Sequence, residues 1–488
     1  MKHLILTSAA CALCLSAFAA EQASHTNVLF IIVDDLTTTL SCYGDRDART
    51  PHMDALAESG VRFDRAYTQF SLCNPTRAAF LTGCYPERTG VYDLTASFRK
   101  ALPDAVTLPQ LFKNAGYTAG RIGKVFHVSD DAWTKLDVQL GAPLAKDQKI
   151  LEEAKLAEAS EGDLSDPPHE TSKAAKKGAK NDENAGKSYN RCYAPSKRPA
   201  SDFTDYQIAD EAIATLESFK DKPFFLAVGF IRPHTPYVAP QAFFDLLDPL
   251  KLEMPAFYQP GGENLAAIPN AALRPNNNVF RYQAPSVKEA REARRAYLAT
   301  TAFADSQVGR VLAKLAALGL DKNTIVVLTG DHGYQLGEHG LWAKQTLFEE
   351  GTRVPLIVAA PGVKPGVCTG LVEQVDIYPT LAGLSGLPIP KQVQGRTLQP
   401  LLADPSAPGK PAVFSTMVST HTKLIGHSIR TERYRYIEWD EGRGGRQLYD
   451  HTSDPHELNN LADQPAQAAL ITNLQSQLAS HLKESASK

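Results

Sequence analysis

A cysteine and an arginine lie about one helical turn apart in the segment Cys-Asn-Pro-Thr-Arg, residues 73–77. Asn74 can cap a helix and Pro75 suits its first position, so the segment predicts a helix that begins just after Cys73. The free N–H groups and the positive dipole end of a helix N-terminus favour an anion. The Arg77 guanidinium can reach the same place. These residues therefore predict a site where a tetrahedral oxyanion meets a nucleophile.

The cysteine of this segment supports two other interpretations. A free cysteine at the start of a helix is often a buried, inert thiol. A cysteine close to an arginine can also be a low-pKa thiolate nucleophile, as in cysteine phosphatases. Those enzymes need a longer loop than the three residues that separate Cys73 from Arg77, so the thiolate interpretation ranks low.

Carboxylates follow two apolar runs that read as buried strands of a parallel sheet. Residues 27–33 are continuously apolar after Asn27 and end in Asp34 and Asp35, and residues 324–329 are followed by Asp331. Ligands of open α/β sheets bind at the carboxyl ends of the strands. Because clustered carboxylates repel one another unless a cation lies between them, these aspartates predict a site for a hard metal such as Ca²⁺. The alternative is a set of solvated turns.

Basic side chains follow the other predicted strands. Lys124 and His127 come after a short strand that ends near Ile122, and His234 lies between two prolines after the apolar run that ends at Ile231. Flanking prolines restrict the backbone and hold the direction of His234, which suits a positioned general acid. Taken alone, a lysine or histidine in such a place is more often structural or exposed.

Composition and charge describe a globular protein with one large core and a smaller C-terminal domain. The chain has 488 residues, is 43% hydrophobic and carries a net charge of −3, so no basic field invites nucleic acid. Residues 142–200 are rich in small and charged residues and predict an exposed insertion. A linker at 404–411 and an α+β domain at 412–488, with an amphipathic helix over 465–483, complete the chain.

Residues 1–20 predict a secretory signal peptide. Lys2 precedes an apolar stretch that is too short for a membrane span, and Ala17-Phe18-Ala19 offers a small-x-small cleavage site. A lipoprotein signal with Cys11 is the alternative. The mature chain is therefore expected to be secreted or periplasmic without an integral membrane segment. No Asn-x-Ser/Thr sequon has a permitted middle residue, since Asn74-Pro75-Thr76 carries proline there, and this favours a bacterial source.

The pattern Cys-x-Pro-x-Arg at residues 73–77 resembles the signature of the type I, formylglycine-dependent sulfatases. Separate segments from Asn27 to Asp450 match that family in order. Three of them, at residues 123–127, 331–344 and 428–436, resemble its iduronate-2-sulfatase branch. The resemblance implies an alkaline-phosphatase-like α/β sandwich, with a large mostly parallel sheet in a catalytic domain over 21–403 and a small C-terminal α+β subdomain.

The resemblance also implies the cofactors. In this family the cysteine that corresponds to Cys73 is oxidised to formylglycine, here by a formylglycine-generating or an anaerobic sulfatase-maturating enzyme. One divalent ion, Ca²⁺ rather than Mg²⁺, is expected on Asp34, Asp35, the modified Cys73, Asp331 and His332. Histidine is an unusual ligand for Ca²⁺, which prefers oxygen.

The remaining roles are carried over in the same way. Arg77, Lys124 and Lys344 are expected to bind sulfate oxygens, His234 to protonate the leaving oxygen with help from Lys344, and His127 to act as the base that releases sulfate. The two histidine roles could be partly shared.

The implied substrate is a sulfated oligosaccharide or polysaccharide, most simply a 2-O-sulfated uronic acid. Arg99 or a basic residue from 190–198 is a candidate partner for its carboxylate. Two alternatives stay open at this point. One is a phosphate or phosphonate ester hydrolase of the same superfamily, and the other is a non-catalytic, secreted glycan-binding protein.

Overall fold

The computed structural model describes residues 26–127, 136–141, 150, 192–255, 258, 267–273, 279–280 and 285–487. The predicted signal peptide at 1–20 and most of the predicted insertion at 142–200 lie outside these residues.

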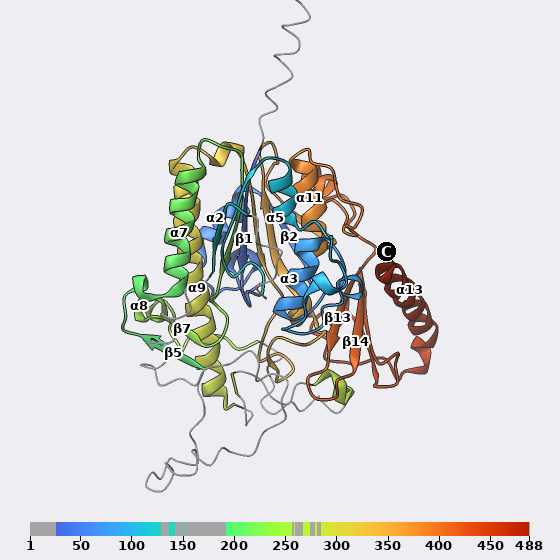
Figure 1. Ribbon diagram of the computed structural model, residues 1–488. Helices are drawn as coiled ribbons and strands as arrows, with labels where there is room; N and C mark the ends of the chain where they lie inside the picture. The colour runs from blue at the N-terminus through green and yellow to red at the C-terminus, as the bar shows by residue number, and fades with distance from the viewer. Residues whose placement is uncertain are drawn as a thin grey trace, which may run out of the picture.

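An eight-stranded sheet runs through the middle of the molecule (Figure 1). Its spatial order is β12-β2-β11-β8-β1-β6-β3-β4. All neighbouring strands pair in parallel except at β11, which is antiparallel to both β2 and β8. The strands are β1 Asn27–Val33, β2 Val61–Tyr67, β3 Thr118–Gly123, β4 Val138–Leu140, β6 Phe224–Phe230, β8 Thr324–Gly330, β11 Arg353–Ala359 and β12 Gly366–Glu373.

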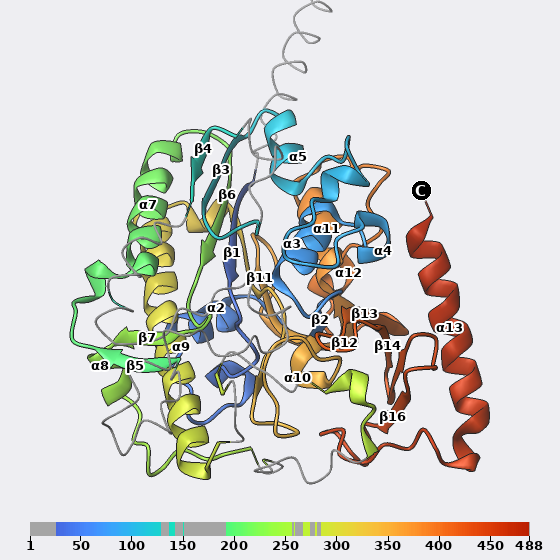
Figure 2. The ribbon, with the colours of Figure 1, turned by 60° about the horizontal axis from the view of Figure 1, so that its bottom comes forward.

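Strand β1 divides the core into two layers. Its side chains are fully buried and alternate between the two faces of the sheet, as the continuous apolar run predicts. Phe30 packs in the cluster formed with helices α3, α5 and α11, whereas Ile31 packs in the cluster formed with α2, α7 and α9. Figures 1 and 2 show these two sets of helices on opposite sides of the sheet.

The described helices differ widely in length. The longest, α9, begins at a capping box in which the Ser286 side chain accepts from the Glu289 amide and the Glu289 side chain accepts from the Ser286 amide. The helices are α2 Pro51–Ser59, α3 Cys73–Thr82, α4 Pro86–Thr89, α5 Leu108–Asn114, α7 Thr204–Phe219, α8 Gln241–Asp245, α9 Val287–Ala317, α10 Glu349–Thr352, α11 Ile377–Leu384, α12 Gln399–Ala403 and α13 Ala468–Ala486.

A second, four-stranded antiparallel sheet follows in the chain and packs against α13 (Figures 1 and 2). Its strands, in order, are β13 Ala412–Val418, β14 Ile425–Thr431, β15 Tyr434–Trp439 and β16 Arg446–Asp450. The predicted linker at 404–411 falls between α12 and β13. A large, mostly parallel sheet with a smaller α+β part beside it is therefore confirmed, while the exact domain limits stay a prediction.

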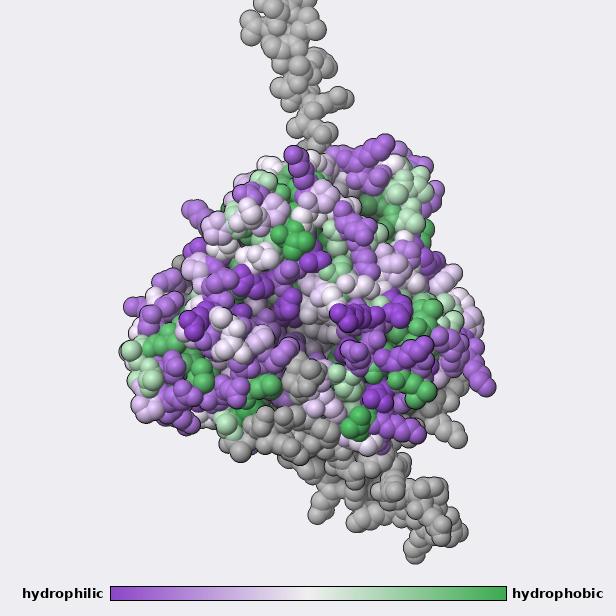
Figure 3. Space-filling view, turned by 180° about the vertical axis from the view of Figure 1, so that it is seen from behind, coloured by the Kyte–Doolittle hydropathy of each residue, from purple (hydrophilic) through white to green (hydrophobic). Residues whose placement is uncertain are grey.

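Two short pairs of strands complete the described structure. Strands β5 Tyr193–Ser196 and β7 Tyr237–Pro240 pair in parallel, and β9 Gln335–Leu336 and β10 Trp342–Ala343 form an antiparallel pair. None of the described helices is long and apolar enough to cross a bilayer. The face seen in Figure 3 is largely hydrophilic, with small scattered apolar patches.

Candidate active site

Four neighbouring parallel strands end at the same edge of the large sheet. Strands β8, β1, β6 and β3 lie side by side in this order, so their carboxyl ends meet there. Asp34 and Asp35 follow β1, Lys124 follows β3 and His234 follows β6. Asp331 follows β8 directly. The structure therefore gathers residues that are almost 300 positions apart in the chain: the Asp35 amide donates to Asp331 Oδ1 at 2.9 Å.

Helix α3 brings Cys73 to this edge, but it begins earlier than the sequence suggests. Cys73 is its first residue and Leu72 its N-cap, so the Thr76 amide already bonds to Leu72 O at 3.1 Å. The prediction that Asn74 caps the helix is wrong. The Asn74 side chain donates instead to the carbonyls of Asp93 and Ala96, both at 2.8 Å, because it lies within the first turn and faces that loop.

The Cys73 thiol is fully buried among charged groups. Its Sγ lies 3.0 Å from Lys344 Nζ, 3.2 Å from His332 Nε2 and 4.0 Å from Asp35 Oδ1. Burial, with the nearby Asp34 charge, raises the pKa of Cys73 well above its ordinary value, although Lys344 acts in the opposite direction. An unmodified Cys73 is therefore a poor thiolate nucleophile at neutral pH, which argues against the cysteine-phosphatase interpretation.

Arg77 bridges two of the carboxylates. Its Nη2 lies 2.8 Å from Asp34 Oδ1 and its Nε lies 3.0 Å from Asp331 Oδ2, and all three side chains are fully buried. Its remaining nitrogen, Nη1, donates to the carbonyls of Lys124 and Val125. The guanidinium is thus a structural clamp between β1, β3 and β8, and each of its nitrogens is already engaged with the protein.

Lys124 pairs with the second oxygen of Asp34, at 2.7 Å. Burial alone would raise the pKa of Asp34, but Lys124 and Arg77 together bring it well below its usual value, so this carboxyl is ionised. Lys124 reaches its place because the end of β3 lies close against its parallel neighbour β6, where the Lys124 amide donates to Gly229 O at 2.9 Å. A Cβ atom on Gly229 would lie 1.9 Å from Lys124 O, so only glycine fits at that position.

Asp35 is the most densely surrounded carboxylate of the group. Its Oδ1 lies 2.9 Å from Lys344 Nζ and 3.2 Å from His332 Nε2, and its Oδ2 lies 4.0 Å from His234 Nε2. Burial raises its pKa, but Lys344 and the two histidines outweigh this effect and lower it. The backbone of Asp35 is left-handed, with φ of 61°, which is uncommon outside glycine and marks a constrained position.

Two histidines present the same nitrogen to the centre. His332 Nδ1 lies 2.9 Å from Gly333 O and His234 Nδ1 lies 2.7 Å from Thr235 O. A carbonyl only accepts hydrogen bonds, so in the neutral rings Nδ1 carries the proton and Nε2 offers a lone pair. In both rings this Nε2 faces Asp35, which is the orientation expected of a metal ligand or of a proton carrier.

The donor set fits a hard divalent cation. Ligand atoms of Asp34, Asp35, Cys73 and His234 lie within 4.8 Å of one another, and those of Cys73, Asp331 and His332 form a second such group. Asp35 Oδ2 is buried and accepts no hydrogen bond from the described residues. Three carboxylates here face three permanent cations, Arg77, Lys124 and Lys344, so a bound divalent ion would give the centre the net positive charge that an anionic substrate requires.

The remaining predicted residues differ in where they lie: His127 follows β3 at this edge, whereas Arg99 bonds to its own loop. His127 is half-buried, three residues beyond Lys124 at the end of β3. The Arg99 guanidinium donates to Pro103 O, Ala105 O and the Gln110 side chain, all close in the chain, so these bonds hold it to its own loop. The basic segment 190–198 is described from Cys192 onward. Within it, Arg198 pairs with Asp202.

Gln374 is a buried link in the site that the sequence did not suggest. Its Nε2 donates to Gly330 O at 2.6 Å and its Oε1 accepts from Thr76 Oγ1 at 3.1 Å, while Thr76 Oγ1 also lies 3.0 Å from Asp331 O. The link ties the first turn of α3 to the end of β8. Thr76 belongs to the cysteine segment, so the sequence could have indicated it as part of the site. Nothing in the local sequence distinguishes Gln374 from other glutamines.

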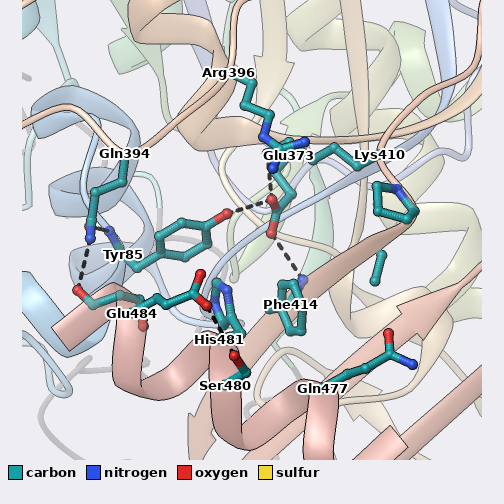
Figure 4. Close-up of a pocket in the computed structure, with 13 residues that line it drawn as sticks. Tyr85, Glu373, Gln394, Arg396, Lys410, Phe414, Gln477, Ser480, His481 and Glu484 are labelled. Atoms are coloured by element: carbon teal, nitrogen blue, oxygen red, sulfur yellow. Dashed lines mark hydrogen bonds and ion pairs between the residues drawn. The ribbon is translucent and has the colours of Figure 1, made fainter. Parts of the chain in front are cut away.

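A separate cavity of about 500 Å³ lies between α13 and β13 (Figure 4). Glu373 at this cavity accepts from Tyr85 Oη and Lys410 Nζ, both at 2.6 Å, and from the Phe414 amide at 2.9 Å. The His481 ring stacks on Phe414 with centroids 3.6 Å apart. None of the predicted site residues lines this cavity, and the charge of Glu373 is already balanced by Lys410. The cavity is therefore part of the contact between α13, β13 and the large-sheet domain, which we call the seam.

A further carboxylate group is likewise neutralised by the protein itself. Glu349, His451 and Glu457 lie close enough to hold a metal. However, Arg435 pairs with both Glu349 and Glu457, at 2.5 Å each. A buried arginine thus takes the place that a cation would need, and the group is structural.

Comparison with known proteins agrees with this geometry. The family model "Sulfatase" matches residues 26–387, and the model "N-sulphoglucosamine sulphohydrolase, C-terminal" matches residues 337–484. Iduronate 2-sulfatase from Mus musculus is 32% identical over 490 residues, which cover 85% of this chain and 84% of that protein. A sulfatase from Formosa agariphila is also 32% identical, with 91% of this chain and 84% of that protein covered.

A solved structure with a similar fold is a phosphonate monoester hydrolase from Silicibacter pomeroyi. The TM-score is 0.74 at 25% identity, and the match covers 94% of this chain and 96% of that one. Together with the family match, it confirms the predicted alkaline-phosphatase-like fold. The chain belongs to the sulfatase family, whose members hydrolyse sulfate esters, and relatives of the iduronate 2-sulfatase type cover most of its length.

Proposed function

We propose that this protein is an exported sulfatase that removes sulfate from a sulfated glycan, with formylglycine made from Cys73 as the nucleophile and one Ca²⁺ ion as the metal. The observation that carries the proposal is the surroundings of Cys73. One buried side chain has a lysine at 3.0 Å, a histidine at 3.2 Å and an ionised carboxylate at 4.0 Å, all at the carboxyl edge of a parallel sheet.

The proposed metal ligands are Asp34, Asp35, Asp331, His332 and the modified residue 73. The ion would lower the pKa of a hydroxyl bound to it and balance the charge of sulfate. Formylglycine would supply, in its hydrated form, the hydroxyl that attacks sulfur. Its formation needs a formylglycine-generating or an anaerobic sulfatase-maturating enzyme as a partner.

The protein's own side chains have separable roles in this proposal. Lys124 and Lys344 bind sulfate oxygens through ammonium groups that already lie at the centre, and Arg77 adds its charge while it holds Asp34 and Asp331 in place. His234 donates a proton from Nε2 to the leaving oxygen, because this nitrogen faces the centre beside Asp35. His127 is the proposed base for the release of sulfate.

The proposed substrate is a 2-O-sulfated uronic acid residue in an oligosaccharide or polysaccharide. The relatives named iduronate 2-sulfatase, at 31–32% identity over most of the chain, support this choice. Another relative, from Bacteroides thetaiotaomicron, is named N-acetylglucosamine-6-O-sulfatase and is 29% identical, so the glycan must be tested directly.

The first test compares wild type, Cys73→Ala and Cys42→Ala, each produced together with a maturating enzyme. Sulfate release from 2-O-sulfated oligosaccharides should disappear in Cys73→Ala and persist in Cys42→Ala, because the half-buried Cys42 thiol lies outside the site. Mass spectrometry of the peptide around residues 72–88 should show the aldehyde in wild type. Sulfate release by Cys73→Ala at the wild-type rate would end the proposal.

A phosphate or phosphonate ester hydrolase is the second candidate. The fold match to the phosphonate monoester hydrolase favours it, since both chains are covered almost completely. The same preparation should be assayed on phosphate, phosphonate and sulfate esters of one alcohol. A kcat/KM that is higher for the phosphonate than for the sulfate would select this second function.

A further inference from the structure

Tyr297 of helix α9 forms hydrogen bonds at both ends of the turn that carries Asp35. Its hydroxyl donates to Asp35 O at 2.8 Å and accepts from the Thr37 amide at 3.0 Å. The residue is fully buried. Its ring stacks on Tyr334, with centroids 5.4 Å apart, and Tyr237 meets it edge-on at 5.6 Å. The ring that carries the hydroxyl is thus held by packing against two other aromatic rings.

This hydroxyl acts where the backbone is least favourable. Asp35 has a φ of 61°, and a left-handed residue other than glycine costs free energy unless its surroundings hold it. The Tyr297 hydroxyl bonds to the carbonyl of Asp35 and to the amide two residues later, so it closes the turn from outside. Without it, residues 35–37 would lose the contacts that select this conformation.

The direction of the Asp35 carboxylate depends on that conformation. Its two oxygens face Lys344, His332 and His234, and its own amide bonds to Asp331 Oδ1. A relaxed backbone would turn the carboxylate away from these groups. Burial also raises the pKa of Tyr297, so its hydroxyl keeps its proton and can donate at every working pH.

We propose that Tyr297 is a positioning residue: its hydroxyl holds the left-handed turn at Asp35 and so sets the Ca²⁺ affinity and the turnover of the site. The inference rests on the metal-dependent sulfatase proposed above. Groups that orient metal ligands from outside typically change affinity or activity about 10–100-fold when they are removed.

The test is Tyr297→Phe, which deletes the hydroxyl and keeps the ring in its aromatic packing. Tyr43→Phe is the matched control, because the Tyr43 hydroxyl also accepts from a backbone amide, that of Leu356 at 2.9 Å. It also donates to the backbone carbonyls of Phe63 in β2 and Leu356 in β11, and so it bonds to these strands and not to the Asp35 turn. Tyr334→Phe removes a hydroxyl of the same aromatic cluster that bonds to Tyr237 and not to the Asp35 turn.

Ca²⁺ binding to the chelated protein is measured by calorimetry, together with kcat, KM and the melting temperature in chelator. Tyr297→Phe should weaken Ca²⁺ binding about 10-fold or more and lower kcat with little change in KM, since the substrate contacts remain. Both control variants should stay within about twofold of wild type in Ca²⁺ affinity, even where melting falls by as much as in Tyr297→Phe.

A Tyr297→Phe protein that melts earlier but binds Ca²⁺ as tightly as wild type would overturn the positioning role, because a purely structural loss moves stability alone. An equal loss of affinity in Tyr334→Phe would overturn it too. Absence of Ca²⁺ binding by wild type would instead contradict the proposed function.

Discussion

Each oxygen of the Asp34 carboxylate is paired with a different cation, Arg77 on one side and Lys124 on the other. Arg77 in turn reaches Asp331, so a single guanidinium fixes the distance between the ends of β1 and β8. This geometry changes the view of Arg77 as mainly a sulfate ligand. Its charge still acts on a bound anion, but its nitrogens first hold together two carboxylates that would otherwise repel each other.

The change Arg77→Lys tests this clamp at the scale of one residue. Lysine keeps the charge but cannot reach Asp34, Asp331 and two carbonyls at once. We expect kcat/KM for sulfate release to fall roughly 10²–10³-fold and the melting temperature to fall as well. Arg65→Lys, at a surface pair with Glu432, should change neither quantity. Near wild-type turnover in Arg77→Lys would show that charge alone is sufficient.

At the scale of elements, the sequence predicts best where a strand leads directly to a functional residue. The apolar runs before Asp34 and Asp331 identify buried parallel strands, and their ends meet at one edge, as expected. Lys344, by contrast, does not follow an apolar run that predicts a buried strand of the large sheet. It precedes a loop whose Gln345 amide bonds to Ser71 O at 3.1 Å, a contact between distant segments that no periodicity encodes. The resemblance to known sulfatases, and not the local pattern, identified this lysine.

Helix α13 shows how far periodicity can be trusted. Leu474 and Leu478 are buried against the second sheet, as the amphipathic pattern predicts, whereas the helix starts and ends about three residues later than expected.

Leu478→Ala should lower the free energy of unfolding by about 2–5 kcal/mol, because it opens a cavity among Ile429, Tyr436 and Leu448. Gln477→Ala, one position away and exposed, should stay within about 0.5 kcal/mol of wild type in urea denaturation. Equal losses in both variants would refute this packing.

At the scale of the whole molecule, the second sheet braces the loops that carry the site. Arg435 of β15 pairs with Glu349, and it donates to Leu347 O at 3.1 Å, three residues after Lys344. The Thr416 amide of β13 bonds to Gln69 O at 2.9 Å, just before the cysteine segment. Composition could not predict this arrangement, because charged residues are mostly exposed and nothing local marks a buried arginine.

The seam at α13 should make the molecule less stable in mild acid. Burial, with the nearby Lys410 charge opposed by Glu373, lowers the pKa of His481 to about 4, so the folded protein keeps this ring neutral. The unfolded chain binds a proton below about pH 6.5. His481 therefore does not lower the free energy of unfolding above about pH 6.5. Below that pH the free energy of unfolding falls progressively until about pH 4, because only the unfolded chain takes up the proton.

His481→Phe removes this titration and keeps an aromatic ring against Phe414 and Tyr85. Between pH 7.5 and 5.0, wild type should lose up to about 2 kcal/mol more unfolding free energy than His481→Phe, as measured by urea denaturation. His421→Phe, at an exposed position, should keep the pH dependence of wild type. Burial raises the pKa of the neighbouring Glu373, but Lys410 outweighs this effect and lowers it, so the stability that Glu373 contributes is lost mainly below about pH 5 and does not enter this comparison. Identical pH dependence in wild type and His481→Phe would mean that the ring is already protonated in the folded seam at pH 5.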